Sequence, residues 1–180
     1  MIHYNSTCRP GGKEMIALHI LDTKMFMKQF LVLNTFDRWN LSEGTITTFC
    51  TFTIDGTWQR DFYDPDGVNV LYDRTLTPWS KLREYCFSLI RGKNTPLSFK
   101  FVFVLPEELI GEFLTANGLN NDPDEIAGLY LNISFRNKKL LLTTGTALRT
   151  FSLDRSIDAS WDVYVRGFLR RYGIAAETAE

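Results

Sequence analysis

The segment YDRTLTPW at residues 72–79 recurs as LDRSIDASW at residues 153–161. In both, Asp-Arg is followed by a hydroxyl residue, an aliphatic residue and Thr or Asp, and a Trp comes at almost the same distance. An internal repeat constrains a whole architecture and is therefore tested before other features. The recurrence predicts that the chain contains two copies of one structural unit.

The same alignment holds outside the repeated phrase. Alternating apolar positions and amphipathic stretches of the first half match those of the second at an offset of 83 residues. The matched stretches are 16–20 with 99–103, 26–31 with 109–114, and 46–52 with 129–135. We therefore expect two β-α-β-β-β-α units, over residues 16–92 and 97–173, related by a pseudo-two-fold axis. The predicted class is α+β, mainly antiparallel, with helices on one face of one or two shared sheets.

The two ends of the chain differ from this pattern. Residues 1–14 are polar and aperiodic, and the codons for Gly-Gly-Lys-Glu can carry the ribosome-binding string GGAGG shortly before that of Met15. We therefore expect Met15 to be the start, with residues 1–14 a translated leader or a disordered tail. Residues 15–174 are expected to form a single globular domain, followed by a tail at 175–180.

Composition limits the function classes. The 20 Lys and Arg nearly balance the 21 Asp and Glu, which argues against broad nucleic-acid binding through many phosphate contacts. The apolar runs are shorter than the ~20 residues that cross a bilayer, so no membrane partner is expected. Three cysteines without metal-ligand spacing are typical of a reducing cytoplasm. We expect a cytoplasmic protein without a cofactor.

Local turn signals predict two further details. Residues 45–54 alternate as one continuous strand, and Asp55-Gly56 is typical of a hairpin turn. A three-residue loop would pair Ile54 with Trp58 and keep apolar residues on one face. In the second half, residues 147–153 are expected to form a separate strand.

The Asp-Arg pairs are the most distinctive polar feature and allow two interpretations. Asp73, Arg74, Asp154 and Arg155 could meet at the pseudo-symmetry axis, where two carboxylates act as acid and base or hold a cation. Alternatively, each pair stabilises the strand-to-helix corner whose Trp enters the core. A phrase present in both copies favours the structural interpretation, because an active site seldom needs both copies.

Other candidate sites have weaker signals. Asp61, Asp64 and Asp66 could bind a hard metal ion, but their spacing misses the calcium-loop pattern and Asp-Pro-Asp-Gly is an ordinary turn sequence. Cys50 and Cys86 lie on apolar faces and are expected to be buried. The sequence contains no recognisable nucleophile triad or phosphate loop.

The run ITTFCTFTIDGTWQRDFYD at 46–64, with MIALHI at 15–20, resembles a family of small uncharacterised proteins from anaerobic Gram-positive bacteria. The resemblance covers residues 15–174 and implies a bacterial domain of unknown function, with no site to transfer. The duplicated unit is also similar to the domain of a sliding DNA clamp. It departs from that domain by adding a helix after each unit and by lacking tandem domains.

The leading hypothesis is a non-catalytic cytoplasmic binding or scaffold protein with an unidentified protein partner. It rests on few catalytic residue types and on balanced charge. The alternatives are a hydrolase or transferase that uses the Asp-Arg pairs, and a clamp-like factor that associates with nucleic acid.

Overall fold

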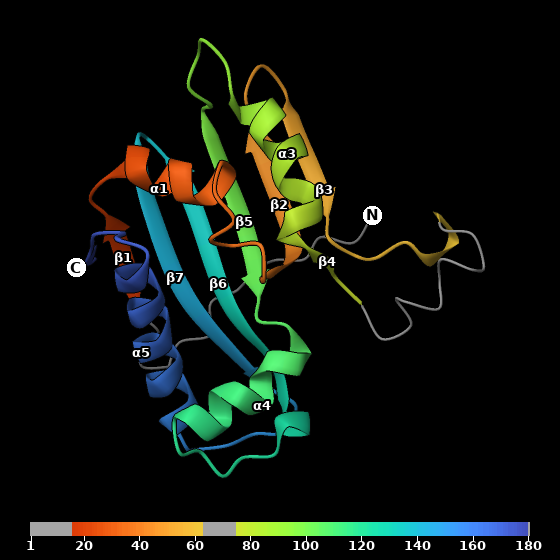
Figure 1. The fold of residues 1–180 in the computed structure, drawn as a ribbon, viewed down its shortest axis with the longest axis vertical. Helices are drawn as coiled ribbons and strands as arrows, with labels where there is room; N and C mark the ends of the chain where they lie inside the picture. The colour runs from red at the N-terminus through yellow and green to blue at the C-terminus, as the bar shows by residue number, and fades with distance from the viewer. Residues whose placement is uncertain (1–15, 63–74, 180) are drawn as a thin grey trace.

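The computed structural model describes residues 16–62 and 75–179. In these residues the chain forms one antiparallel sheet of eight strands and four α-helices, which lie on one face of the sheet (Figure 1). The strands are β1 Ala17–Ile20, β2 Asn40–Thr47, β3 Thr51–Asp55, β4 Thr77–Pro78, β5 Ser98–Val104, β6 Ile126–Arg136, β7 Lys139–Leu148 and β8 Ala176–Thr178. The helices are α1 Thr23–Leu31, α3 Trp79–Ile90, α4 Glu107–Ala116 and α5 Ser156–Arg171, with short 3-10 turns η1 Arg60–Phe62 and η2 Pro123–Glu125. The α+β class is confirmed.

The sheet has the strand order β3-β2-β5-β6-β7-β1-β8, and β4 pairs with β2 beside this path. In register, Ser98 lies between Thr47 on β2 and Arg136 on β6. Three connections therefore meet at one end of the sheet: the β2–β3 turn, the loop 91–97 after α3, and the β6–β7 turn.

Strand alternation places the core between the sheet and the helices. Phe99, Phe101 and Phe103 of the central strand β5 are buried, whereas Lys100 between them is exposed on the opposite face. From α1, Phe30 packs on all three phenylalanines, with ring centroids 5.3–6.5 Å away. Aromatic side chains therefore form the contact between α1 and the central strand of the sheet.

Most helices begin where capping residues predict. Asp22 accepts a hydrogen bond from the Met25 amide at 2.8 Å, Pro106 precedes α4, and Gly173 ends α5 with a φ of +67°. By residue type, the sequence predicts Asp158 as the cap of the last helix, but this prediction is wrong because α5 begins two residues earlier, at Ser156.

The predicted hairpin at Asp55-Gly56 is also wrong. The chain reverses at residues 48–50, so that Thr47 pairs with Thr51 and the expected single strand becomes β2 and β3. A Cβ atom at Gly56 would lie only 1.9 Å from the Leu41 carbonyl oxygen. Glycine is therefore required at position 56 by the close approach of another backbone, and not by a tight turn.

Two strand assignments in the second half change as well. β7 continues without interruption to Leu148, and residues 149–155 form no strand, with Phe151 91% exposed in that loop. At the C-terminus, where we expected a tail, β8 pairs with β1, and the Ala179 amide donates to the Ala17 carbonyl oxygen at 2.8 Å. The sequence also predicts a short strand from Val68 to Tyr72, after the Asp-Pro-Asp-Gly turn, and this segment lies outside the described residues.

The two tryptophans of the repeated phrase are core residues. Trp79 and Trp161 are fully buried, and their indole N–H groups donate to the backbone carbonyls of Phe30 and Tyr130 at 3.0 and 2.8 Å. The aligned strands have different neighbours, since β5 lies between β2 and β6 whereas β1 lies between β7 and β8. The duplication itself stays a prediction.

Candidate functional site

The described Asp-Arg pair lies at the start of α5. The Asp154 carboxylate accepts hydrogen bonds from the Ser156 amide and hydroxyl, both at 2.9 Å. The backbone bond and then the hydroxyl bond lower the pKa of this carboxyl. Arg155 forms an ion pair with Asp158 at 3.0 Å. Both side chains are exposed, and these hydrogen bonds and this ion pair stay within residues 154–158.

The remaining predicted site residues are not brought together in the described chain. Asp73, Arg74, Asp64 and Asp66 lie outside the described residues. Asp61 is exposed in η1. Within residues 16–62 and 75–179, no group of three or more His, Cys, Asp or Glu side chains is placed to hold a metal ion.

The two described cysteines differ. Cys86 is a buried residue of α3. Burial raises the pKa of its thiol to about 12, so the reactive thiolate is scarce at neutral pH. Cys50 is exposed in the β2–β3 turn, and the expectation that it is buried is wrong. The reason is the unpredicted chain reversal at 48–50, which turns this residue away from the core.

Exposed cations gather at the end of the sheet where the three connections meet. They come from α1, the loop after α3 and the β6–β7 turn, and we call this region the basic end. Its cations are Lys28, Arg91, Lys93, Arg136, Lys138 and Lys139. The stretches that supply them, 23–36, 85–106 and 126–153, contain no Asp or Glu. The basic end therefore has positive charge without carboxylates in its own segments.

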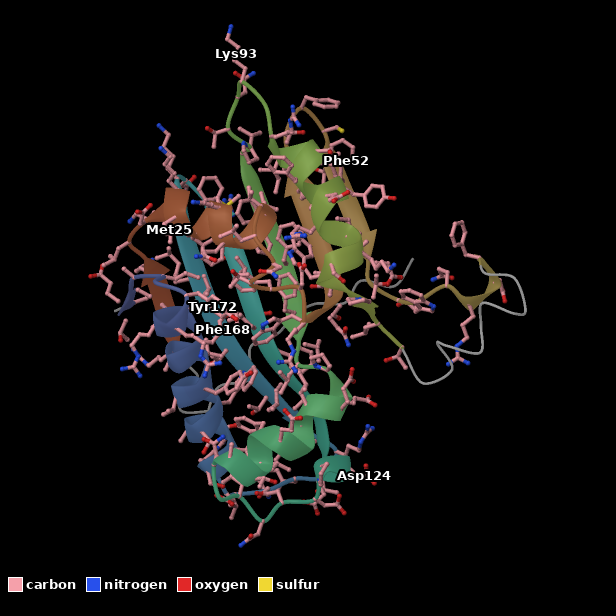
Figure 2. All side chains as sticks on the ribbon, in the orientation of Figure 1. Met25, Phe52, Lys93, Asp124, Phe168 and Tyr172 are labelled. Carbon is pink, nitrogen blue, oxygen red and sulfur yellow. The ribbon has the colours of Figure 1, made fainter. Side chains whose placement is uncertain are left out.

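Carboxylates gather at the opposite end, around α4, η2 and the start of α5. Lys93 lies at the top of the molecule and Asp124 near its bottom (Figure 2). The carboxylates of this acidic end are Glu107, Glu108, Glu112, Asp122, Asp124, Glu125, Asp154 and Asp158. The charges of the two ends cancel in the formal sum of −1, so composition alone gives no sign of either.

A cavity of about 510 Å³ opens at the basic end between α1, the end of α3 and the sheet. Its floor includes Phe99 and Phe135, whose rings stack with centroids 5.1 Å apart. Apolar side chains from the two helices form its walls, and three cations of the basic end also line it. The wall residues are Met27, Leu31, Val32, Phe87 and Ile90, and the cations are Lys28, Arg91 and Lys93. We call this the inner cavity.

The loop 91–97 is fixed at both ends. The Arg91 amide donates to the Phe87 carbonyl at 2.7 Å, and the Leu97 amide donates to the Thr47 carbonyl of β2 at 2.9 Å. The Arg91 guanidinium lies 5.6 Å from the centre of the Phe87 ring, within the range of a cation–π contact. These contacts hold Arg91 at the wall of the inner cavity.

On the other side of this loop lies a second hollow of about 670 Å³, which we call the outer groove. Its rim carries Phe49, 92% exposed, and Leu97, 69% exposed. Phe49 contacts Phe52 edge to face at 5.9 Å. Large apolar side chains this exposed, beside cations, are typical of an interaction surface.

Arg91, Gly92 and Lys93 follow the last residue of α3, and in the sequence alone they are typical of an ordinary helix end. The cavity is built by segments far apart in the chain, so no motif marks it. The sequence does contain one indication of this site. The apolar stretches that meet here carry cations and no carboxylates.

A family model matches residues 29–177 and is described as a family of unknown function, DUF5721. The chain belongs to the DUF5721 family. A search among curated proteins and a search among solved structures found no match. The match covers β2 to β7, the outer groove, the acidic end and most of the inner cavity, whose lining residues Thr23, Met27 and Lys28 precede it. The suggested bacterial group and the likeness to a sliding clamp stay predictions.

None of the helices in the described part of this DUF5721 chain is both long enough and apolar enough to span a membrane.

Proposed function

We propose that the protein is a non-catalytic binding protein whose basic end docks an acidic segment of a partner protein. The observation that carries this proposal is the combination of Arg91 and Lys93 with the exposed apolar side chains of Phe49 and Leu97. The cations would attract and orient carboxylates of the partner, and the outer groove would take an apolar side chain as an anchor.

A protein partner suits this surface better than a nucleic acid does. Binding along a nucleic-acid backbone relies on a track of cations that follows successive phosphates. At the basic end Arg91 and Lys93 line both hollows, and the outer groove also carries Phe49 and Leu97, which favours discrete anchoring. The clamp-like alternative stays a hypothesis, and DNA is included below as a competing ligand.

The non-catalytic part of the proposal rests on the side chains in the described chain. Asp154 is engaged by Ser156, Asp158 by Arg155 and Thr146, and the Cys86 thiol is held protonated by burial. The hydrolase or transferase alternative also depends on Asp73 and Arg74 and stays a hypothesis. We also propose a cytoplasmic location, which the free, exposed thiol of Cys50 suits.

The test compares partner capture by the full chain and two charge variants. Arg91→Glu with Lys93→Glu reverses two cations of the basic end. Lys24→Glu with Lys81→Glu reverses two cations in the first turns of α1 and α3, where acidic side chains are tolerated well. Proteins retained from an extract of the source cells are identified by mass spectrometry, and binding of each purified candidate is then measured.

We expect purified partners to have acidic segments and to bind the basic-end variant about tenfold or more weakly, while the control variant binds like wild type. Affinity should fall with added salt. Equal binding by both variants would overturn the proposal. So would complete displacement of the partner by duplex or single-stranded DNA, which would support the nucleic-acid alternative.

A further inference from the structure

We propose that the inner cavity is a site for a small organic carboxylate with an apolar body, such as an acyl chain. This ligand is additional to the protein partner proposed above, although both would use cations of the basic end. The inference follows from the shape of the cavity, the chemistry of its walls and the charge at its lining.

The size and walls of the inner cavity fit an apolar body. Its volume of about 510 Å³ lies within the range of about 300–1,000 Å³ that small-molecule sites occupy. The stacked rings of Phe99 and Phe135 form a flat floor, and Met27 and Ile90 face the space from α1 and α3. An unbranched chain or a flat ring would bury its apolar surface against these side chains.

The charges at the cavity select the head group. Lys28 approaches from α1, and Arg91 and Lys93 from the loop after α3, so cations stand on two sides. The part of the lining that the structure describes contains no Asp or Glu. A carboxylate at this position would gain charge-assisted hydrogen bonds, whereas an ammonium group would be repelled.

The polar lining argues against a larger polyanion. Besides the cations, the cavity offers the side chains of Thr23, Asn94 and Thr95 and no glycine-rich run of amides like those that cradle phosphate chains. A head with one negative charge and a longer apolar body therefore fits better than a nucleotide.

The test is a methyl NMR titration of the full chain with decanoate, decanol and decyltrimethylammonium. We expect decanoate to shift the methyl signals of Leu31 and Ile90 saturably, and to leave Ile157 near the other end of the sheet unchanged. Decanol should bind about tenfold or more weakly, because it lacks the charge-assisted hydrogen bonds, and the cationic analogue should bind more weakly still.

Two kinds of variant locate the site. Met27→Trp and Ile90→Trp each fill the cavity from a different helix, so that one remains informative if the other is unstable. Both should abolish the decanoate shifts while retaining the native circular dichroism spectrum. Lys28→Glu should weaken decanoate binding about tenfold or more, and Lys24→Glu on the same helix should not.

The outcomes separate this inference from the proposed function. Decanoate binding that survives both cavity-filling substitutions, or decanol binding as tight as that of decanoate, would overturn the carboxylate site. Met27→Trp leaves Arg91, Lys93 and the outer groove in place, so partner capture should persist in that variant. Decanoate binding without capture of any acidic partner would overturn the proposed function and leave the cavity site standing.

Discussion

Trp79 and Trp161 end the two copies of the repeated phrase, and the helices that carry them begin differently. Trp79 is the first residue of α3 and follows the extended pair Thr77–Pro78 of β4. Trp161 lies in the second turn of α5, which begins at Ser156. Both indoles are fully buried with their N–H groups bonded to backbone carbonyls. The two corners therefore share a buried tryptophan but differ in the backbone conformation of the residues that precede it.

The difference has a local cause in the sequence. Pro78 disfavours helical conformation at the residue before it. Thr77 is also held extended because its backbone N–H donates a hydrogen bond to the Gly56 carbonyl oxygen at 2.8 Å. The second phrase has no proline, and its Asp154 carboxylate accepts a hydrogen bond from the Ser156 amide in a local turn that leads directly into the helix. Similar phrases thus specify the same core contact while neighbouring residues decide where the helix begins.

The largest effects are expected from the tryptophans themselves. Trp79→Ala and Trp161→Ala should each lower the free energy of unfolding by about 3–5 kcal/mol, because each leaves a large hole in the core. Urea denaturation followed by far-UV circular dichroism measures both values. If either variant kept near wild-type stability, that tryptophan would not stabilise the core, and the two corners would differ in this respect.

Gly56 belongs to the first corner and should show the next largest effect. Gly56→Ala should destabilise the protein by about 1–3 kcal/mol, because the new methyl group would overlap the Leu41 carbonyl. Gly111→Ala in α4 is the matched control, since a Cβ there meets no atom within 4 Å. That control should stabilise the protein by about 0.5–1 kcal/mol through helix propensity. Equal behaviour of the two variants in urea would contradict the assigned role of Gly56.

A smaller effect is expected at the residue that distinguishes the corners most clearly. Pro78→Ala should cost about 0.4–1 kcal/mol, mainly because the unfolded chain gains freedom. The extended conformation of Thr77 should survive, since β4 still pairs with β2. Backbone chemical shifts check this point. Helical shifts at residues 77–78 would show that the proline alone causes the difference in where the two helices begin.

The smallest effect is expected at Asp154, which is fully exposed. The folded state lowers the pKa of this carboxyl, so its contribution is present above the unfolded pKa and is lost as pH falls through the folded pKa. Asp154→Asn should therefore lower the melting temperature slightly at neutral pH and not in strong acid. A difference from wild type that does not change with pH would exclude the charge as its cause.

The parts of the fold that local chemistry controls could be predicted from the sequence. The Asp22 cap of α1, the apolar stripes of α1 and α4, the alternation of β5 and β6, and the burial of both tryptophans are confirmed. The errors arose where a distant segment decides. Gly56 resembles a turn glycine until Leu41 is brought against it, and Phe151 resembles a strand residue although no element covers it.

The candidate site was less predictable than the fold for the same reason. Met27, Ile90 and Phe135 are ordinary apolar positions in their own elements, and their meeting around a cavity is a tertiary property. The Asp-Arg phrase, by contrast, is contiguous in the sequence and can therefore be recognised without a structure. A count of charges by segment, instead of over the chain, would have indicated Arg91 and Lys93 as unusual.

The position of β1 in the sheet has a consequence for the order of folding. β1 is the first described strand of the chain, and it pairs with β7 and β8, which are the last two. During synthesis, the ribosome must therefore deliver almost the whole polypeptide before β1 finds either neighbour, and the early chain keeps Leu18 and Ile20 unburied until then. Such sequence-distant pairing slows folding and makes the closing step sensitive to C-terminal truncation.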